Sequence, residues 1–113
     1  MVRKARPLPS ASLHIVVALL DGELHGYALM GRVAELSDGA VRMGPGTLYG
    51  TLNRLVEDGL IEETTARVPR DDGERRRYYE LTGVGRAVAV DELVRLRTLV
   101  HRIANHLPGS ATA

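Results

Sequence analysis

The stretch from residue 44 to residue 61 constrains the fold most, because it contains both ends and both faces of one short helix. Its apolar residues recur at helical spacing and form one stripe, Leu48, Leu52, Leu55 and Val56. Pro45 suits a first helical turn, where the missing N–H is not needed, and Gly59 suits the left-handed position just past a helix end. The sequence therefore predicts a helix that begins near Pro45 and ends just before Gly59.

The other face of this helix is polar and consists of Thr47, Gly50, Thr51, Asn53 and Arg54. Asn and Arg side chains can make bidentate contacts with base edges, and Thr offers a hydroxyl and a methyl group. An exposed pair such as Asn53 and Arg54 is more often only a solvated surface. The order of the neighbouring elements favours the other interpretation, a recognition helix that contacts DNA. Tyr49, near the helix start, could equally contact DNA or pack over that start.

Two helices are predicted before this stretch. The first contains the apolar set Leu13, Val16, Val17 and Leu20, can be capped by Ser10 or Ser12, and ends at Gly22. The second runs from Tyr27 to about Ser37. Two helices joined by a short turn that contains Gly are half of a helix-turn-helix arrangement.

Two strands are predicted after the central helix, Leu60–Thr65 and Arg75–Leu81. The polar stretch between them contains Pro69 and Asp72-Gly73, a strong hairpin signal. A hairpin directly after a recognition helix is a wing. Residues 41–43 are predicted as a further, very short strand.

The arginines of the wing are candidates for DNA contacts. Alternation places Arg75 and Arg77 on one face with Leu81, which favours that face as the one that meets the core, and it places Arg76 on the other. At most part of the triplet can therefore point at one phosphate backbone, and the triplet could also be a strand edge kept soluble by charge. Arg70, at the predicted wing tip, is better placed for phosphate or the minor groove, although two adjacent aspartates would repel DNA.

A long helix is predicted from about Gly83 to His106, with Thr82 as its N-cap. A heptad seam runs along it, formed by Leu93, Leu96, Val100, Ile103 and Leu107. The seam spans only two heptads, so it could pack on its own domain or on a partner helix. We expect a partner helix, because a second apolar set could make the intramolecular contact, namely Val84, Val88, Val94 and Leu99.

Composition limits the chain to one small domain. It has 113 residues with 44% hydrophobic content. The expected division is a flexible basic arm over 1–9, a winged helix-turn-helix over 10–82, a dimerisation helix over 83–107 and a flexible tail over 108–113. The fold class is mainly α (α+β). The net charge of +1 does not by itself indicate a nucleic-acid binder. Evidence for DNA binding must therefore come from where the charges lie along the chain.

Other classes of function are disfavoured by what the sequence lacks. There is no Cys, which excludes thiolate metal sites and a Cys nucleophile and fits a cytoplasmic setting. The four histidines show no metal-ligand spacing. Tyr49 stands where a G-x-G-x-x-G nucleotide motif needs its third Gly. No segment approaches the roughly 20 apolar residues of a membrane span. We expect no catalytic residue, no metal, no cofactor and no membrane partner, so the chain is not expected to be an enzyme.

Four motifs in this order resemble the PadR-like family of winged-helix transcriptional regulators, particularly its short-tailed members. They are Leu24-His25-Gly26-Tyr27, Gly44-Pro45-Gly46-Thr47-Leu48-Tyr49, Leu55-Val56-Glu57-Asp58-Gly59-Leu60-Ile61 and Arg77-Tyr78-Tyr79-Glu80-Leu81-Thr82. The resemblance covers about Leu13 to His106.

The resemblance implies a cytoplasmic, DNA-binding homodimer, usually a repressor, whose C-terminal helix builds most of the dimer interface. It places Tyr49 at the DNA-facing start of the recognition helix and Arg77 in the second strand of the wing. Some relatives bind phenolic acids or flat drugs at or near the dimer interface, whereas this chain has no Trp with which to stack such a ligand.

The expected function is therefore that of a homodimeric repressor that binds double-stranded DNA at a pseudo-palindromic operator. A small-molecule effector could relieve repression, and the sequence leaves both its existence and its identity open. The expected DNA contacts are Thr47, Tyr49, Gly50, Asn53, Arg54, Arg70, Arg75 and Arg77. The alternative is a winged-helix module that uses the same face to bind another protein.

Overall fold

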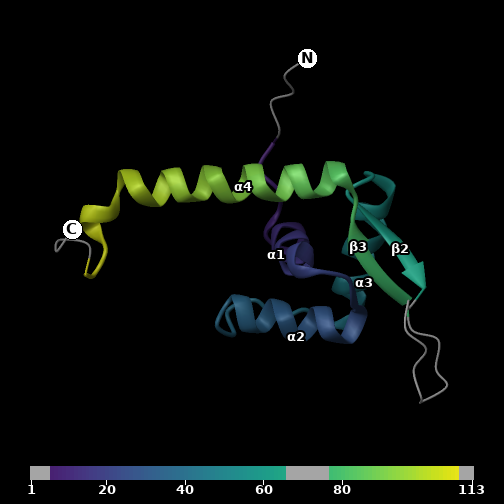
Figure 1. Ribbon diagram of the computed structural model, residues 1–113. Helices are drawn as coiled ribbons and strands as arrows, with labels where there is room; N and C mark the ends of the chain where they lie inside the picture. The colour runs from purple at the N-terminus through teal and green to yellow at the C-terminus, as the bar shows by residue number, and fades with distance from the viewer. Residues whose placement is uncertain (1–5, 66–76, 110–113) are drawn as a thin grey trace.

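The computed structural model describes residues 6–65 and 77–109, which form a group of helices with a small antiparallel sheet at one side (Figure 1). The elements in chain order are α1 (Ser10–Ala18), η1 (Leu19–Asp21), β1 (Leu24–His25), α2 (Gly26–Leu36), α3 (Pro45–Glu57), β2 (Ile61–Thr65), β3 (Arg77–Leu81), α4 (Gly83–Arg102) and η2 (Ala104–His106). The predicted winged helix-turn-helix order is confirmed. None of the helices in these two ranges has both the length and the apolarity needed to cross a membrane.

The sheet has the order β1-β3-β2, so β3 is its central strand. Leu24 pairs with Tyr79 on one side of β3, and Ile61 pairs with Leu81 on the other. The strand predicted at residues 41–43 is wrong, because this segment has no strand structure. Both edges of β3 are already occupied by β1 and β2, so residues 41–43 have no β3 edge to pair with, although Met43 is buried in the core.

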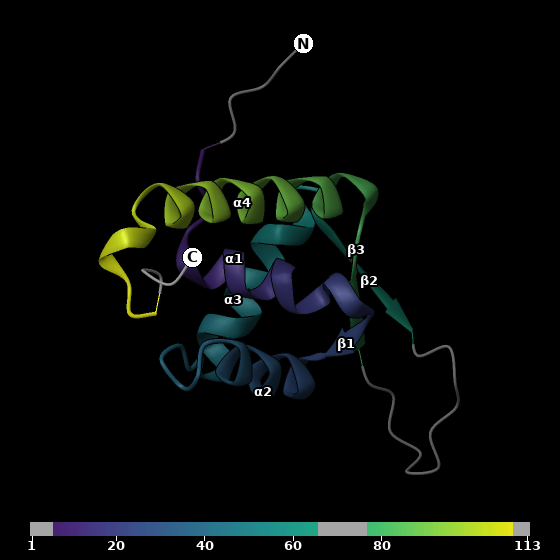
Figure 2. The ribbon, with the colours of Figure 1, turned by 60° about the vertical axis from the view of Figure 1, so that its left-hand side comes forward.

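Helix α1 lies at the centre of the domain and contacts α2, α3 and α4 (Figure 2). Because it is covered on several sides, its buried residues do not form the narrow stripe that the sequence indicated. The buried set is Ser12, Ile15, Val16 and Ala18, whereas Leu13 and Val17 are only half-buried. The predicted Ser cap is also wrong, because Pro9 occupies the N-cap position and no side chain caps the helix.

Helix α3 has the predicted ends. Pro45 opens it, and Gly59 follows it with a φ of 76°. The Gly59 amide donates to the Val56 carbonyl (3.0 Å) and the Leu60 amide donates to the Leu55 carbonyl (3.0 Å). This pair of bonds is a Schellman motif, which satisfies the last carbonyls of the helix and turns the chain into β2.

The buried face of α3 is rotated relative to the predicted one. Thr51, predicted on the outer face, is buried and donates its hydroxyl to the Thr47 carbonyl at 2.8 Å. Val56, predicted in the apolar stripe, is exposed. Thr51 lies between Leu48 and Leu55 on the helical surface, and its bond to Thr47 satisfies the hydroxyl that this position buries.

Helix α4 begins directly against the connection between α3 and β2. The Thr82 hydroxyl accepts from the Gly85 amide (3.0 Å) and donates to the Gly59 carbonyl (2.6 Å), which confirms Thr82 as the N-cap. The Thr82 amide donates to the Leu60 carbonyl at 3.0 Å. A Cβ on Gly85 would lie 2.7 Å from the carbonyl carbon of Leu60 and closer still to its oxygen. Only glycine allows this approach.

The inner face of α4 uses small residues. Gly85, Ala89 and Glu92 are buried, and Val88 packs against the core. The predicted intramolecular set is therefore wrong in its other three members, Val84, Val94 and Leu99, which are all exposed. At Gly85, where the helix approaches the domain most closely, the contact has no room for a larger side chain.

Glu92 joins α4 to the start of the chain. One of its carboxylate oxygens accepts from the Leu8 amide (2.7 Å), and the other accepts from Arg95 Nε (3.0 Å). The hydrogen bond from Arg95 lowers the pKa of Glu92 below its ordinary 4.5, against the opposing effect of burial. Leu8, which the sequence placed in the basic arm, is half-buried against the core.

The approach of α4 can be tested with a pair of glycines in its first turn. We expect Gly85→Ala to lower the free energy of unfolding by about 3 kcal/mol, because the added methyl overlaps the Leu60 backbone. Gly83→Ala is the control, since a Cβ there meets nothing within 4 Å, and it should be neutral or stabilising. Urea unfolding measures both variants, and equal effects would refute the close contact.

A second prediction concerns pH. Since the folded pKa of Glu92 is lowered, its contribution to stability is present above about pH 4.5 and is lost as the pH falls through the folded value. Glu92→Gln should cost about 1–2 kcal/mol at pH 7 and progressively less below pH 4.5. Asp91→Asn, an exposed neighbour, controls for the change in net charge. A gap between wild type and Glu92→Gln that stays constant from pH 7 to pH 3 would contradict the assignment.

Candidate nucleic-acid interface

The outer face of α3 is open and polar. Thr47, Gly50, Asn53 and Arg54, all predicted to contact DNA, are exposed there. A Cβ built on Gly46 or on Gly50 would meet nothing within 4 Å, so these two positions leave the helix backbone accessible. The surface therefore offers hydrogen-bonding side chains around a stretch of bare backbone, to which another molecule can approach closely.

Arg54 is the cation that α3 carries. It is exposed and has no ion-pair partner within residues 6–65 and 77–109. Arg32 of α2, in contrast, is paired with Asp21 (3.3 Å) and with Glu35. An unpaired guanidinium keeps its five donors for an external acceptor such as a base or a phosphate.

Tyr49 packs across the start of α2. A Cβ on Gly26 would lie 3.0 Å from Tyr49 Cζ and closer still to its hydroxyl, so the two helix starts meet at this contact. Of the two roles left open by the sequence, the packing role is observed. The ring is nevertheless 41% exposed, so part of it remains on the outer surface.

Of the arginines predicted to lie in the wing, the structure describes Arg77. Arg77 is exposed, and its Nε lies 3.6 Å from Glu63 Oε1 in a surface ion pair. Such pairs contribute little stability and exchange readily for other partners. Arg70 and Arg75 lie outside the described residues. The sequence left open which face of β3 meets the core. Tyr79 and Leu81 of the odd-numbered face pack against it, Tyr78 of the other face is also buried, and burial raises the pKa of the Tyr79 hydroxyl.

Two further residues near the helix starts were not selected from the sequence. Tyr27, next to Gly26 in the first turn of α2, is 77% exposed. Arg42, three residues before α3, is exposed and has no ion-pair partner in the described ranges. The exposure of Tyr27 could have been predicted from the helical spacing, because Tyr27 does not fall on the face that Leu29 and Val33 bury. Arg42 was not considered as a surface residue because residues 41–43 were incorrectly predicted to form a strand.

The second half of α4 extends beyond the rest of the domain (Figures 1 and 2). Four of the five seam residues are exposed, namely Leu93, Val100, Ile103 and Leu107, and Leu96 is half-buried. The helix predicted to continue to His106 ends at Arg102, so Ile103 and Leu107 lie just beyond α4. An apolar stripe of this size on a projecting helix is typical of a protein–protein contact surface.

The structure describes no group of three or more His, Asp or Glu side chains arranged to hold a metal ion within residues 6–65 and 77–109. His25 has a structural role, because its Nδ1 accepts from the Ala28 amide at 3.2 Å and caps α2. Its ring also packs edge-on against Tyr78, with centroids 5.5 Å apart.

A helix-turn-helix with an open third helix, followed by a hairpin and a projecting apolar helix, defines a winged-helix protein. Residues 15–91 match the Transcriptional regulator PadR-like family. The chain is also 38% identical over 103 residues to Transcriptional regulator Rv3488 of Mycobacterium tuberculosis (strain ATCC 25618 / H37Rv), a match that covers 88% of this chain and 91% of that protein. The chain therefore belongs to the PadR-like family of transcriptional regulators, and this family consists of regulators rather than enzymes.

Solved structures have the same fold. A PadR-like transcriptional regulator from Bacillus cereus strain ATCC 14579 superimposes with a TM-score of 0.71 at 23% identity, covering 87% of this chain and 91% of that one. Bacillus subtilis PadR, solved in complex with operator DNA, gives a TM-score of 0.65 at 23% identity, covering 76% and 48%. The winged-helix class and the family resemblance predicted from the sequence are confirmed.

The contact between Gly26 and Tyr49 can be tested by a double-mutant cycle. We expect Gly26→Ala to cost about 1–2 kcal/mol of unfolding free energy, because the new methyl displaces the Tyr49 ring. In a Tyr49→Ala background the same change should cost much less. Gly31→Ala, in the same helix with nothing within 4 Å, is the control. An equal cost in both backgrounds would show that the two residues do not interact.

Proposed function

We propose that the chain is a homodimeric repressor that binds a pseudo-palindromic operator in double-stranded DNA. The observation that carries this proposal is the outer face of α3, where Asn53 and Arg54 are exposed beside the bare backbone of Gly46 and Gly50. The fold shared with Bacillus subtilis PadR, whose structure contains operator DNA, supports it.

In this proposal, helix α3 recognises the base sequence of the operator. Asn53 and Arg54 can each make two hydrogen bonds to a base edge, and Thr47 can contact a thymine methyl or donate its hydroxyl. Gly50 lets the helix enter the major groove closely. Tyr49 contributes through the exposed part of its ring.

Phosphate contacts would then fix the position of the helix. Tyr27 and Arg42, together with the backbone amides at the start of α3, are suited to this role, since a helix N-terminus favours anions. Arg77 would exchange its weak pair with Glu63 for a phosphate. Arg70 and Arg75 complete the proposed wing contacts.

The dimer would form through the seam of α4. Covering Leu93, Leu96, Val100, Ile103 and Leu107 with the same residues of a second copy gives a two-fold interface. Two α3 helices about 34 Å apart would then match half-sites one helical turn apart.

The remaining parts of the expected arrangement are also proposals. Residues 10–82 would form the DNA-binding unit and 83–107 the dimerisation helix, while most of the arm expected over 1–9 and of the tail expected over 108–113 lies outside the described residues. The protein would act in the cytoplasm, and a small-molecule effector could relieve repression.

A winged-helix module that binds another protein through α3 is the alternative, and the net charge of only +1 favours it. Salt dependence separates the two. Neutralising phosphates releases counterions, so DNA affinity falls steeply as salt rises, whereas contact with a neutral protein surface changes little.

Arg54→Ala tests base reading. We expect operator affinity to fall by about 1–3 kcal/mol, or roughly 5- to 150-fold, because a bidentate contact is lost, while the thermal stability of the domain is retained. Arg97→Ala, an exposed arginine of α4 outside the seam, is the control. Fluorescence anisotropy at 150 mM salt measures both variants, and unchanged affinity for Arg54→Ala would remove this residue from the interface.

Ile103→Asp tests the seam. Ile103 is 47% exposed in the single chain, so the carboxylate is tolerated there but would be buried in a dimer. We expect monomers by sedimentation velocity. Val84→Asp, on an exposed residue at the other end of α4, should leave the dimer intact. A dimer of normal stability for Ile103→Asp would place the interface elsewhere.

A further inference from the structure

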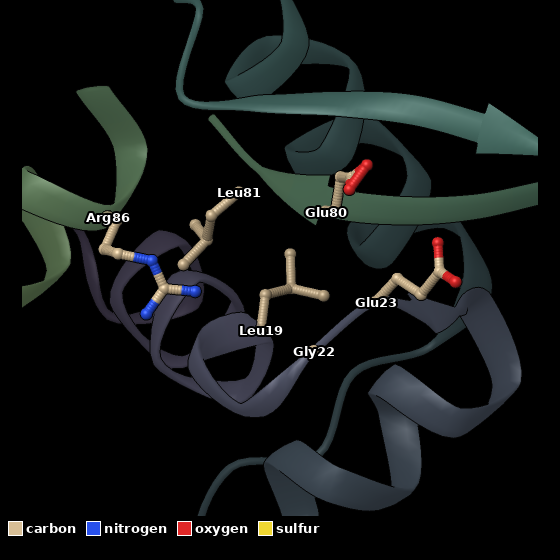
Figure 3. Close-up of a pocket in the computed structure, with 6 residues that line it drawn as sticks. All are labelled: Leu19, Gly22, Glu23, Glu80, Leu81 and Arg86. Carbon is tan, nitrogen blue, oxygen red and sulfur yellow. The ribbon is translucent and has the colours of Figure 1, made fainter. Parts of the chain in front are cut away.

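The first half of α4 is fixed to its own domain. Gly85 touches the connection between α3 and β2, and Glu92 accepts from the Leu8 amide. Arg86 reaches from α4 toward η1, where its Nη2 donates to the Leu20 carbonyl at 3.3 Å (Figure 3). The domain therefore sets the direction in which α4 leaves it.

The face of α4 that packs on the domain continues along the projecting half, where it is uncovered. Residues seven apart lie on the same line of a helix. Along one line, Glu92 is buried, whereas Leu99 is exposed. Along the next, Ala89 is buried, Leu96 is half-buried and Ile103, just past the helix end, is exposed. One face of α4 therefore begins as a contact with its own domain and ends as an apolar surface that the described part of the chain leaves open.

The opposite face of α4 does not continue in this way. Val90 and Val94 are exposed there, and the residues seven further on are the exposed polar residues Arg97 and His101. A surface that changes from apolar to polar along the projecting half suits contact with water. A partner helix should therefore lie on the inner face, with the seam.

The seam is symmetric about Thr98. Leu93 and Ile103 are each five residues from this position, and Leu96 and Val100 are each two residues from it. If a two-fold axis passes through this point between antiparallel helices, Leu93 of one copy meets Ile103 of the other. In the same way, Leu96 meets Val100. Each apolar residue of the helical part of the seam then has an apolar partner.

The position of the domain disfavours a parallel pair. Because the seam continues the inner face of α4, a parallel partner would run back along that face toward Ala89, where α1 of the first copy already packs. In an antiparallel pair the first half of the partner helix points away from this domain. The two domains then lie at opposite ends of the pair.

The two arrangements also differ in the distance between the starts of the two α4 helices. A helix rises 1.5 Å per residue, so an antiparallel pair centred on Thr98 separates the two copies of Gly85 by about 40 Å. Since Gly85 is held against the end of α3, this separation is close to the ~34 Å between half-sites one helical turn apart. Parallel helices would bring the two Gly85 residues within about 10 Å, which is too close for such half-sites.

We infer that two copies of this chain pair their α4 helices antiparallel, with the two-fold axis at Thr98. Leu99, which the seam does not include, lies beside this axis and packs against its own copy. The length of α4 from Gly85 to Thr98 then sets the separation of the two α3 helices and hence the spacing of the operator half-sites. The inference rests on the proposed dimer and specifies how its two helices run.

Distances between spin labels test the orientation. The chain has no Cys, so one introduced cysteine carries one nitroxide label per copy. Val84→Cys, Asp91→Cys and Thr98→Cys place the label at exposed positions outside the seam along α4 of the full chain. Pulsed dipolar spectroscopy should give more than about 40 Å for the Val84 pair, an intermediate distance for the Asp91 pair and the shortest distance for the Thr98 pair.

A pair of aspartate variants tests Leu99. Leu99→Asp should weaken the dimer at least tenfold in sedimentation experiments, because its carboxylate would be buried beside a second copy. Val94→Asp is the matched control, since Val94 is also exposed but lies on the opposite face. It should leave the dimer unchanged. Circular dichroism melting checks that each variant folds.

Three results would overturn the inference. Equal distances for the three labelled pairs would show a parallel dimer, and no dipolar coupling in any of them would refute the dimer itself. Equal weakening by Leu99→Asp and Val94→Asp would remove Leu99 from the contact. Failure to bind any operator would refute the proposed function, whereas the predicted order of distances would still establish the antiparallel pair.

Discussion

The contact between Gly85 and the backbone of Leu60 determines how the parts of this molecule are placed. It brings the first turn of α4 against the connection between α3 and β2, and the Thr82 hydroxyl closes the junction by bonding to Gly59. The helix proposed to bind DNA, the base of the wing and the helix proposed to join two copies therefore meet at one rigid point. A shift at this point would change the spacing of the two α3 helices in a dimer.

The same contact explains why α4 has apolar residues on its surface. On the inner side, the close approach is made at Gly85 and Ala89, and Val88 and Glu92 also pack against the domain. Most of the larger apolar residues of α4 lie outside the domain core, and Val100, together with Ile103 just past the helix end, remains exposed.

Local signals predicted the helices well, because caps and periodicity are properties of neighbouring residues. The ends of α3 and the Thr82 cap followed from single residues with one plausible role. The burial of Thr51, the pairing of β1 with β3 and the bond between Leu8 and Glu92 could not be predicted, since each depends on chain segments that meet only after folding. Of the site, the exposure of Asn53 and Arg54 was predictable, whereas the packing of Tyr49 on Gly26 was not.

The central claim is that two copies of α3 bind DNA together. Selection of bound fragments from a random pool of double-stranded DNA tests it most directly, since the enriched sequences report both reading and symmetry. We expect an inverted repeat whose half-sites are centred about 10 base pairs apart. Enrichment of single, unpaired half-sites would contradict the dimer, and no enrichment over input at physiological salt would contradict DNA reading by α3.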